Sequence, residues 1–183
     1  MLSYKESLKI LKETDALIEG HFILSSGLHS DKYIQCAKLL SKPQKAKDLC
    51  QSLAEKINEN FNDFNLVLSP AVGGIVIGYE IGRLLNVETI FAERVNKIFQ
   101  LRRGFEIKKN HKILIVEDVI TTGKSSLECS TLAEKLGAEI VGFASLIDRS
   151  NGKSKINKKI ISQVQIEIPT FTEEDIPEKI KRI

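Results

Sequence analysis

The chain has 183 residues, a length that suits one domain with a buried core. Hydrophobic residues make up 42% of it and charged residues 28%, which is the balance of an ordinary globular protein. The formal net charge is +3 with Lys and Arg spread along the chain, and no apolar run could cross a bilayer, so the composition argues against a nucleic-acid-binding protein and against a membrane protein.

The first part of the chain predicts a helix, a hairpin and a second helix. Ser3 followed by Glu6 is a capping-box pattern, and it opens a helix that we expect to end near Leu17. Residues 20–33 predict a short strand, a polar turn and another strand. Apolar residues at helical spacing predict the second helix over 41–60. The chain thus starts with a helix and not with a signal peptide, so we expect a cytoplasmic protein.

The middle of the chain alternates between short apolar strands and amphipathic helices. Strand patterns come at 66–68, 89–92, 112–116 and 140–147, and helix patterns at 74–85 and 125–136. Strand, helix and strand in this order predict an α/β fold with a parallel sheet and helices on both of its faces. Residues 162–168 alternate like an edge strand. There is no linker or internal repeat, so we expect one domain over residues 1–183.

Residues 93–104 interrupt this alternation. They are polar and basic, and they show no clear period. A long insert without structure of its own is often a functional lid in a compact domain, so we interpret this stretch as a lid.

The three cysteines, Cys36, Cys50 and Cys129, are an odd number without close pairs. This usage is typical of free thiols in a reducing compartment, and we expect them to be buried or half-buried. The three histidines are scattered along the chain, so they do not indicate a metal site.

The residues that carry chemistry follow the apolar strand 113–116. Glu117 and Asp118 come at its carboxyl end, where ligands bind in open α/β sheets. A loop rich in Thr and Gly follows, and Ser125 with Glu128 fits another capping box at the start of the next helix. Free N–H groups and hydroxyls at a helix N-terminus form a ready site for a phosphate.

Two carboxylates beside a phosphate site would repel the phosphates of a nucleotide. A ribose 5-phosphate removes the conflict, because the loop can hold the phosphate while Glu117 and Asp118 accept hydrogen bonds from the two ribose hydroxyls. A Walker A loop is the rival interpretation, but its pattern needs a glycine where Asp118 stands. The remaining alternative is a surface turn without a ligand, which would leave the two acids unexplained.

The segment 113–126 resembles the PRPP motif of the type I phosphoribosyltransferases. The resemblance implies a Rossmann-like core with a variable hood, and transfer of the ribose 5-phosphate of PRPP to a nitrogen base, with release of pyrophosphate in the presence of Mg²⁺. It implies that PRPP is bound by Ala71, Val72, Gly73, Arg94, Glu117, Asp118, Val119, Ile120, Thr121, Thr122, Gly123, Lys124 and Ser125. The catalytic residues would be Asp118, Glu117, Arg94 and Lys97. The metal would be held mainly by PRPP and water, without direct protein ligation.

Nearly the whole chain resembles the orotate phosphoribosyltransferase family in its shorter bacterial and archaeal form. This implies a hood mainly over 1–40, a core over 41–160, and a C-terminal strand and tail over 161–183. Residues 69–74 resemble the family's pyrophosphate loop, whose glycines permit close backbone approach to an anion. Residues 169–175 resemble the family's tail.

The substrate base would be contacted by the hood and by two strand ends. The resemblance implies that Ser26, Gly27 and Tyr33 meet the pyrimidine, and that Thr121 lies near the base. Arg149 corresponds to the arginine that contacts orotate, and its guanidinium suits a carboxylate through two parallel bonds. A surface arginine at a strand end and a structural turn hydroxyl are the alternative interpretations of Arg149 and Thr121.

The lid would supply cations to the site. Arg94 matches the family's arginine at the start of this loop, and Lys97 is the lysine within it. Arg102 and Arg103 are either lid cations or ordinary hairpin residues. In the family the loop reaches across a dimer interface, so we expect a homodimer in which the lid 93–104 enters the partner's site.

The resemblance predicts an Mg²⁺-dependent transferase that makes orotidine 5′-monophosphate and pyrophosphate from PRPP and orotate, in de novo pyrimidine biosynthesis. No nucleic-acid or membrane partner is expected. Two alternatives stay open. A phosphoribosyltransferase for a purine base would not need Arg149, and a non-catalytic PRPP-binding regulator would usually carry a DNA-binding module or a markedly basic face.

Overall fold

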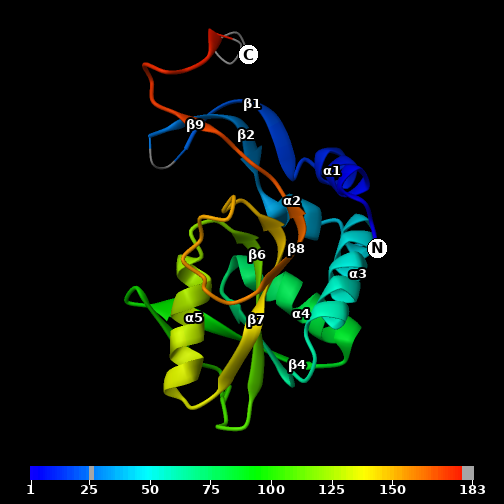
Figure 1. Ribbon diagram of the computed structural model, residues 1–183, viewed down its shortest axis with the longest axis vertical. Helices are drawn as coiled ribbons and strands as arrows, with labels where there is room; N and C mark the ends of the chain where they lie inside the picture. The colour runs from blue at the N-terminus through cyan, green and yellow to red at the C-terminus, as the bar shows by residue number, and fades with distance from the viewer. Residues whose placement is uncertain (25–26, 179–183) are drawn as a thin grey trace.

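A six-stranded sheet with the order β5-β4-β3-β6-β7-β8 forms the core of the molecule (Figure 1). The structure is a computed structural model that describes residues 1–24 and 27–178. The parallel strands are β3 (Leu66–Pro70), β4 (Glu88–Val95), β6 (Lys112–Ile120), β7 (Glu139–Asp148) and β8 (Ile160–Gln165). Strand β5 (Ile98–Leu101) pairs antiparallel with β4 at one edge. The predicted α/β fold with a parallel sheet flanked by helices is confirmed.

Helices cover both faces of this sheet. They are α3 (Pro43–Asn60) and α4 (Gly73–Leu85) on one face and α5 (Lys124–Lys135) on the other (Figure 1). Leu114 of β6 packs in a hydrophobic cluster with α3 and α4, whereas Ile115 packs in a second cluster with α5. Successive side chains of a strand point to opposite faces, so a continuous apolar run in β6 serves both layers.

The hood is a three-stranded sheet with the order β1-β2-β9, beyond one end of the main sheet (Figure 1). Its elements are β1 (Leu17–Ile23), β2 (His29–Ile34) and β9 (Thr170–Phe171), with α1 (Tyr4–Glu13) and α2 (Cys36–Leu40) beside them. The predicted strand, turn and strand over 20–33 is confirmed, and β9 adds a piece of the C-terminal segment to the same sheet. The Sγ atom of Cys36 lies 3.8 Å from the carbonyl oxygen of Asp118, so the hood joins the core near the carboxyl end of β6.

The first helix is shorter than expected. Its capping box is confirmed, because the Ser3 N–H donates to Glu6 Oε2 at 2.8 Å and the Glu6 N–H donates to Ser3 Oγ at 3.3 Å. The helix ends at Glu13 and not near Leu17, which already belongs to β1. Asp15 adopts a left-handed φ of +57° between them, and this conformation cannot continue a helix.

Two other helices begin at positions that differ from the predicted ones. The helix expected over 41–60 begins at Pro43, after the separate short helix α2. The capping box expected of Ser125 and Glu128 is wrong, because the N-cap of α5 is Gly123 and no side chain caps it. Gly123 has a φ of +75°, and this turn lets the helix start earlier, so Ser125 already lies in its first turn.

Two strands extend beyond their apolar patterns. Strand β6 does not end with residues 112–116 but continues to Ile120, so it includes the two acids. It pairs with β7 over this whole length, and the last pair is Ile120 with Asp148. The edge strand predicted over 162–168 is confirmed as β8, which begins earlier, at Ile160, and ends at Gln165, so that residues 166–168 lie outside it.

The absence of regular structure expected over 93–104 is wrong, because most of this stretch forms a β-hairpin, whereas its role as a lid stays a prediction. Strand β4 runs to Val95, and β5 returns antiparallel to it. The turn residues Asn96 and Lys97 have φ values of +50° and +67°, which are typical of a tight hairpin turn. The polar, basic composition hid the alternation in β5, where Phe99 is buried between exposed neighbours.

All three cysteines are buried free thiols, as predicted. Burial raises the pKa of each thiol, so all three stay protonated at neutral pH. Within residues 1–24 and 27–178, no helix is long and apolar enough to span a membrane.

Candidate active site

Glu117 and Asp118, the acid pair, are half-buried residues near the carboxyl end of β6. The Ser126 hydroxyl donates a hydrogen bond to Glu117 Oε2. The Val119 N–H donates to Asp118 Oδ1 at 2.9 Å. These bonds hold both carboxyl groups at the start of the loop that follows.

Burial dominates the titration of the acid pair. It raises the pKa of Glu117 to about 7; the hydrogen bond from Ser126 opposes this, and the charge of Asp118 adds to it. Burial also raises the pKa of Asp118, against the hydrogen bond from the Val119 N–H. A ligand that donates hydrogen bonds to both groups would favour their charged forms. Ribose hydroxyls are donors of this kind.

Residues 119–125, the phosphate loop, lead from β6 into the N-terminus of α5. A Cβ atom on Gly123 would lie 2.8 Å from the Ile156 side chain, and the left-handed φ there also favours glycine. Thr122 organises the turn, because its Oγ1 accepts from the Lys124 N–H at 3.3 Å and its carbonyl accepts from the Lys155 N–H at 3.3 Å. The N-cap residue Gly123 has no side chain to cap α5, so the N–H groups of the first turn other than that of Lys124 are available to an anion.

Residues 69–74, the pyrophosphate loop, touch the acid pair. A Cβ atom on Gly73 would lie 2.8 Å from Oδ1 and 2.9 Å from Oδ2 of Asp118, so only glycine fits there without a shift. The Ala71 N–H donates to the carbonyl of β4 residue Ala92 at 2.8 Å, which fixes the loop to the sheet. Val72 is 82% exposed. The structure thus brings together two stretches that the sequence predicts separately.

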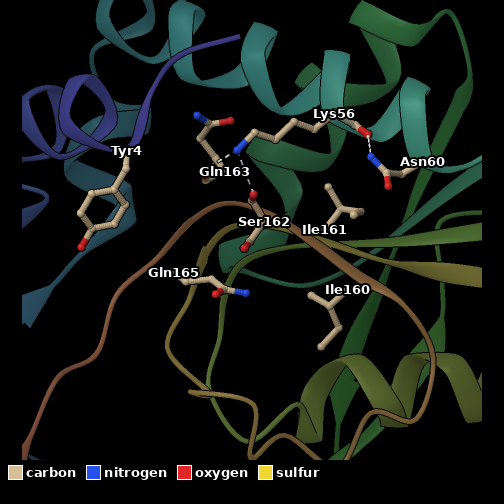
Figure 2. A pocket seen from close by; sticks show the side chains of 8 residues that line it. All are labelled: Tyr4, Lys56, Asn60, Ile160, Ile161, Ser162, Gln163 and Gln165. Carbon is tan, nitrogen blue, oxygen red and sulfur yellow. Dashed lines mark hydrogen bonds between the residues drawn. The ribbon is translucent and has the colours of Figure 1, made fainter.

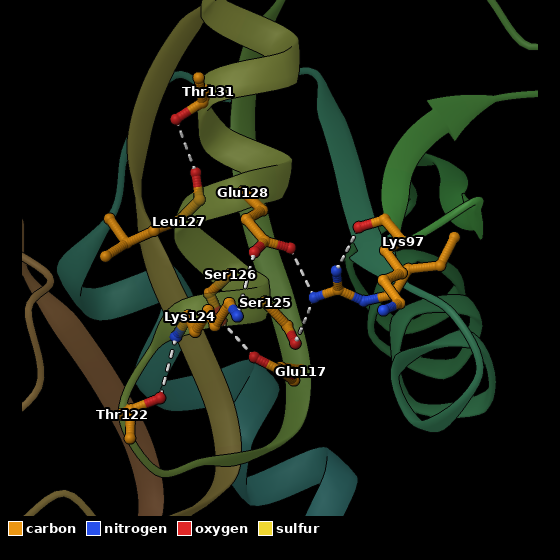
Figure 3. Close-up of polar contacts among 10 residues, drawn as sticks. Lys97, Glu117, Thr122, Lys124, Ser125, Ser126, Leu127, Glu128 and Thr131 are labelled. Carbon is orange, nitrogen blue, oxygen red and sulfur yellow. Dashed lines mark hydrogen bonds and ion pairs between the residues drawn. The ribbon is translucent and has the colours of Figure 1, made fainter.

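Arg94 lies beside the phosphate loop of its own chain. Its Nη2 lies 2.5 Å from Glu128 Oε2 and donates to Ser125 Oγ at 3.4 Å. Its Nη1 donates to the Lys97 carbonyl at 3.0 Å, and its guanidinium carbon lies 4.2 Å from the centre of the Phe99 ring. Figure 3 shows Lys97, Ser125 and Glu128 around this contact. Lys97 itself sits exposed in the hairpin turn.

Of the two arginines after β5, Arg103 fits the interpretation as a hairpin residue, whereas a lid role for Arg102 stays a prediction. Arg103 is a hairpin residue, because its Nη2 and Nε donate to the two oxygens of Glu93 at 2.9 and 3.1 Å. Its guanidinium also lies 5.9 Å from the Phe91 ring. Arg102 is exposed just after β5.

Arg149 follows β7 and lies next to the end of β6. Its N–H donates to the Ile120 carbonyl at 2.8 Å, which places it beside Thr121 at the mouth of the phosphate loop. Its side chain is half-buried, and its Nε atom is shielded from solvent without a hydrogen-bond partner among the described residues. Burial lowers the pKa of this guanidinium, an effect that the nearby Tyr33 opposes. A ligand acceptor would satisfy the unpaired donor.

The hood residues predicted to meet a base are only partly placed. Ser26 lies outside the described residues. Gly27 has a φ of +80°, and its N–H donates to the Leu24 carbonyl at 2.8 Å in the turn after β1. Tyr33 is 38% exposed on β2, with its ring 5.6 Å from that of Phe22. Contact of these residues with a base stays a prediction.

The roles of two residues of the site were not predicted from the sequence. Ser126 binds Glu117, and Glu128 binds Arg94. Both lie on the first turns of α5, on the side that faces the sheet and its hairpin. A helix that begins at Lys124 turns Ser126 toward β6, so the role of Ser126 could have been predicted from the helix start. The contact between Glu128 and Arg94 depends in addition on where the hairpin lies, which the sequence pattern does not show.

Several hollows lie outside the acid pair. The one in Figure 2 has a volume of about 400 Å³ between α1, α3 and β8, where Lys56 Nζ donates to the Gln163 carbonyl at 2.9 Å. The ammonium of Lys56 therefore provides hydrogen bonds to the Ser162 and Gln163 carbonyls of β8. Another has a volume of about 840 Å³, lies between the hairpin and α5, and reaches the phosphate loop at Thr122 and Lys124.

The fold and the site together define a phosphoribosyltransferase, and the family model described as "Phosphoribosyl transferase domain" matches residues 38–178. A curated relative from Carboxydothermus hydrogenoformans, named orotate phosphoribosyltransferase, is 45% identical over 169 residues, which are 92% of this chain and 88% of the relative. One of the same name from Parvibaculum lavamentivorans is 45% identical over 94% of this chain and 91% of its own length. The chain belongs to the orotate phosphoribosyltransferase family.

Solved structures agree on the fold. Orotate phosphoribosyltransferase from Aeropyrum pernix has a TM-score of 0.76 at 22% identity, covering 86% of this chain and 92% of that one. Adenine phosphoribosyltransferase from Thermoanaerobacter pseudethanolicus has a TM-score of 0.68 at 18% identity, covering 87% and 99%. The same fold therefore occurs in enzymes named for a pyrimidine base and for a purine base, and it does not choose between them.

Proposed function

We propose that this protein transfers the ribose 5-phosphate of PRPP to orotate, with orotidine 5′-monophosphate and pyrophosphate as products, in de novo pyrimidine biosynthesis. One observation carries the proposal: Gly73 of the pyrophosphate loop lies against Asp118, and Arg149 is bonded through its backbone to Ile120 at the carboxyl end of the same strand, β6. The curated relatives named orotate phosphoribosyltransferase support the choice of base.

Each loop around the acid pair has a separate task in binding PRPP. The phosphate loop holds the 5-phosphate through the N–H groups of α5 and its hydroxyls. Glu117 and Asp118 accept hydrogen bonds from the ribose hydroxyls, and these donors favour the charged carboxylates against the effect of burial. The pyrophosphate loop, held against Asp118 by Gly73, offers its backbone to the leaving group.

The same groups stabilise the separation of charge during transfer. As pyrophosphate leaves C1, positive charge develops on the ribose ring, and the carboxylates of the acid pair lie on that side. The leaving group gains negative charge, which Arg94 and Lys97 offset. Fixed charges that are already in place lower the barrier without reorganisation at the moment of reaction.

Mg²⁺ would be held mainly by PRPP oxygens and water. Among the described residues, no group of three or more His, Cys, Asp or Glu could hold a metal ion, and the acid pair offers only carboxylate oxygens at one strand end. Such a donor set fits a hard cation that arrives with a phosphate ligand. The bound ion would neutralise the diphosphate and so help it to leave.

Arg149 would give the site its preference for orotate. Its unpaired Nε and the remaining guanidinium donors can hold a carboxylate through two parallel bonds. Thr121 lies beside it, and Tyr33 approaches from the hood, so the base would enter between these residues. A purine base carries no carboxylate for this arginine.

The enzyme would work in the cytoplasm as a homodimer whose hairpin reaches the partner's site. An exposed apolar stripe on and before α4 supports a partner surface, because Val72, Val76 and Tyr79 are 82%, 52% and 66% exposed. Lys97 at the hairpin turn is the cation that would reach across, since Arg94 is tied to α5 of its own chain.

One assay tests the function. The protein is mixed with PRPP and Mg²⁺, and the loss of orotate absorbance is followed, with adenine and hypoxanthine as competing bases. We expect turnover with orotate as the base and no turnover with adenine or hypoxanthine. Turnover with a purine base but not with orotate would overturn the proposal, and binding of PRPP without any turnover would indicate a regulator instead.

A further inference from the structure

Ser126 is a polar residue at a position of α5 that faces the core. It is 0% exposed in the first turn of the helix, where an apolar side chain would be the ordinary choice. A buried hydroxyl needs a partner, and this one donates a hydrogen bond to Oε2 of Glu117 on β6 (Figure 3). Ser126 therefore connects the helix that follows the phosphate loop to the acid pair.

The bond occupies one of the two oxygens of the Glu117 carboxylate. Its other oxygen, Oε1, has no hydrogen-bond partner among the described residues, so Oε1 is left to accept from a ribose hydroxyl. A carboxylate without the serine would turn about its terminal bond and would lose this freedom when the sugar binds. Holding Oε2 thus keeps Oε1 in place before the ligand arrives.

No second donor duplicates this contact. Within residues 1–24 and 27–178, Ser126 provides the only hydrogen bond to the side chain of Glu117. The neighbouring Asp118 has a like charge and disfavours the charged form of Glu117 instead of holding it. The orientation of the Glu117 carboxylate therefore depends on one hydroxyl.

We propose that Ser126 is a positioning residue for the sugar of PRPP, whose hydroxyl fixes the Glu117 carboxylate so that the free oxygen meets a ribose hydroxyl. The proposal rests on the proposed function, since it assumes that the acid pair binds ribose hydroxyls. Because Ser126 lies on the first turn of α5, it also sets the distance between the acceptor of the sugar and the N–H groups that hold the 5-phosphate.

Calorimetry with two probes, ribose 5-phosphate and inorganic phosphate, separates the sugar from the phosphate. We expect Ser126→Ala to raise the Kd for ribose 5-phosphate about tenfold and to leave the Kd for inorganic phosphate unchanged, because only the sugar uses Glu117. Ser130→Ala is the control, since Ser130 is also buried on α5 and its hydroxyl meets Glu134 Oε2 at 3.5 Å. This variant should change neither constant.

A pair of variants with the same shape tests the hydroxyl itself. Ser126→Thr and Ser126→Val add similar volume at the same buried position, but only threonine keeps the donor. Ser126→Thr should therefore bind ribose 5-phosphate more tightly than Ser126→Val, and the KM for PRPP should follow the same order while the KM for orotate stays constant. Equal binding by these two variants would overturn the proposal, whatever the effect of crowding.

A double-mutant cycle tests whether the effect passes through the acid. In a Glu117→Ala background, Ser126→Ala should cause almost no further loss of ribose 5-phosphate binding. A full tenfold loss in that background, or an equal loss of inorganic phosphate binding in Ser126→Ala alone, would show that the serine supports the helix and not the carboxylate. Wild-type protein that binds ribose 5-phosphate but does not turn over orotate would instead refute the proposed function, and the binding cycle would still decide the role of Ser126.

Discussion

A Cβ atom on residue 73 would lie 2.8 Å from Oδ1 of Asp118, so Gly73 and Asp118 fit together only while residue 73 has no side chain. The backbone of Gly73 is helical, as the first residue of α4, and that conformation itself accepts alanine. The requirement for glycine is therefore one of space against a carboxylate. It couples the position of the pyrophosphate loop to that of the acid pair.

Gly73→Ala should raise the KM for PRPP about 10- to 100-fold, because the methyl group displaces either the loop or the Asp118 carboxylate by a few tenths of an ångström. Steady-state kinetics measure this, and circular dichroism checks the fold. Gly20→Ala is the control, since its Cβ would meet the Phe22 ring at an ordinary 3.4 Å. An unchanged KM for PRPP in Gly73→Ala would contradict the packing argument.

Asp118→Asn should lower kcat/KM for PRPP about 100-fold while the fold stays intact, because an amide replaces a charged acceptor of a ribose hydroxyl. The exposed acid Asp48 on α3 gives a matched control, and Asp48→Asn should keep wild-type kinetics. Wild-type kinetics in Asp118→Asn would remove the ribose-binding role from this residue.

Glu117 should make the free protein less stable as the pH rises from about 4.5 to about 7. Its ordinary pKa is 4.5 and burial raises it to about 7, so in this window the folded protein holds a proton that the unfolded chain has released. The unfolded state then binds fewer protons, and stability falls with pH. Melting temperatures of Glu117→Gln and wild type, compared between pH 5 and pH 8, should diverge in favour of the variant. A constant difference across this range would show that Glu117 does not titrate there.

Arg149→Ala should raise the KM for orotate about 100-fold and leave the KM for PRPP nearly unchanged, because the arginine would bind the carboxylate of the base and not the ribose phosphate. Arg149→Lys should restore little, since an ammonium cannot form the paired bonds. Lys153→Ala, a cation in the exposed loop after β7, serves as the control. Equal losses for both substrates would place Arg149 elsewhere in the mechanism.

Mixing of variant subunits should distinguish Lys97 from Arg94. If the hairpin turn enters the partner's site, inactive Lys97→Ala and inactive Asp118→Asn subunits should together regain activity, since one site of the mixed dimer is complete. Arg94→Ala mixed with Asp118→Asn should stay inactive, because Arg94 is held at its own α5. Size-exclusion chromatography of tagged subunits confirms exchange. The opposite pattern would mean that Arg94 is the residue that crosses.

Much of the core follows from local patterns in the sequence. The apolar runs place the parallel strands, and the position of Glu117 and Asp118 after such a run predicts a ligand site at the end of the sheet. These features depend on side-chain periodicity and on the rule for strand ends, which act within a short stretch of chain.

The remaining features depend on contacts between distant residues. Strand β5 of the hairpin buries Phe99 in the cluster that contains α5, whereas the composition of this stretch alone suggests a loop. The sequence predicts a capping box between Ser125 and Glu128. In the structure α5 begins directly after Gly123, and Glu128 instead forms an ion pair with Arg94 of β4. A local pattern therefore cannot show that Glu128 binds Arg94, because Arg94 lies on β4, far away in the sequence.

Strand β9 has a consequence for the order in which the protein can assemble. Thr170 and Phe171 pair with Ser30 and His29, so the hood receives its last strand from chain that has already passed through the whole core. During synthesis, the edge of β2 that pairs with β9 therefore stays open until Thr170 and Phe171 have left the ribosome. Open edges invite pairing with other chains. A chain cut before Thr170 should consequently keep its core but aggregate through the hood.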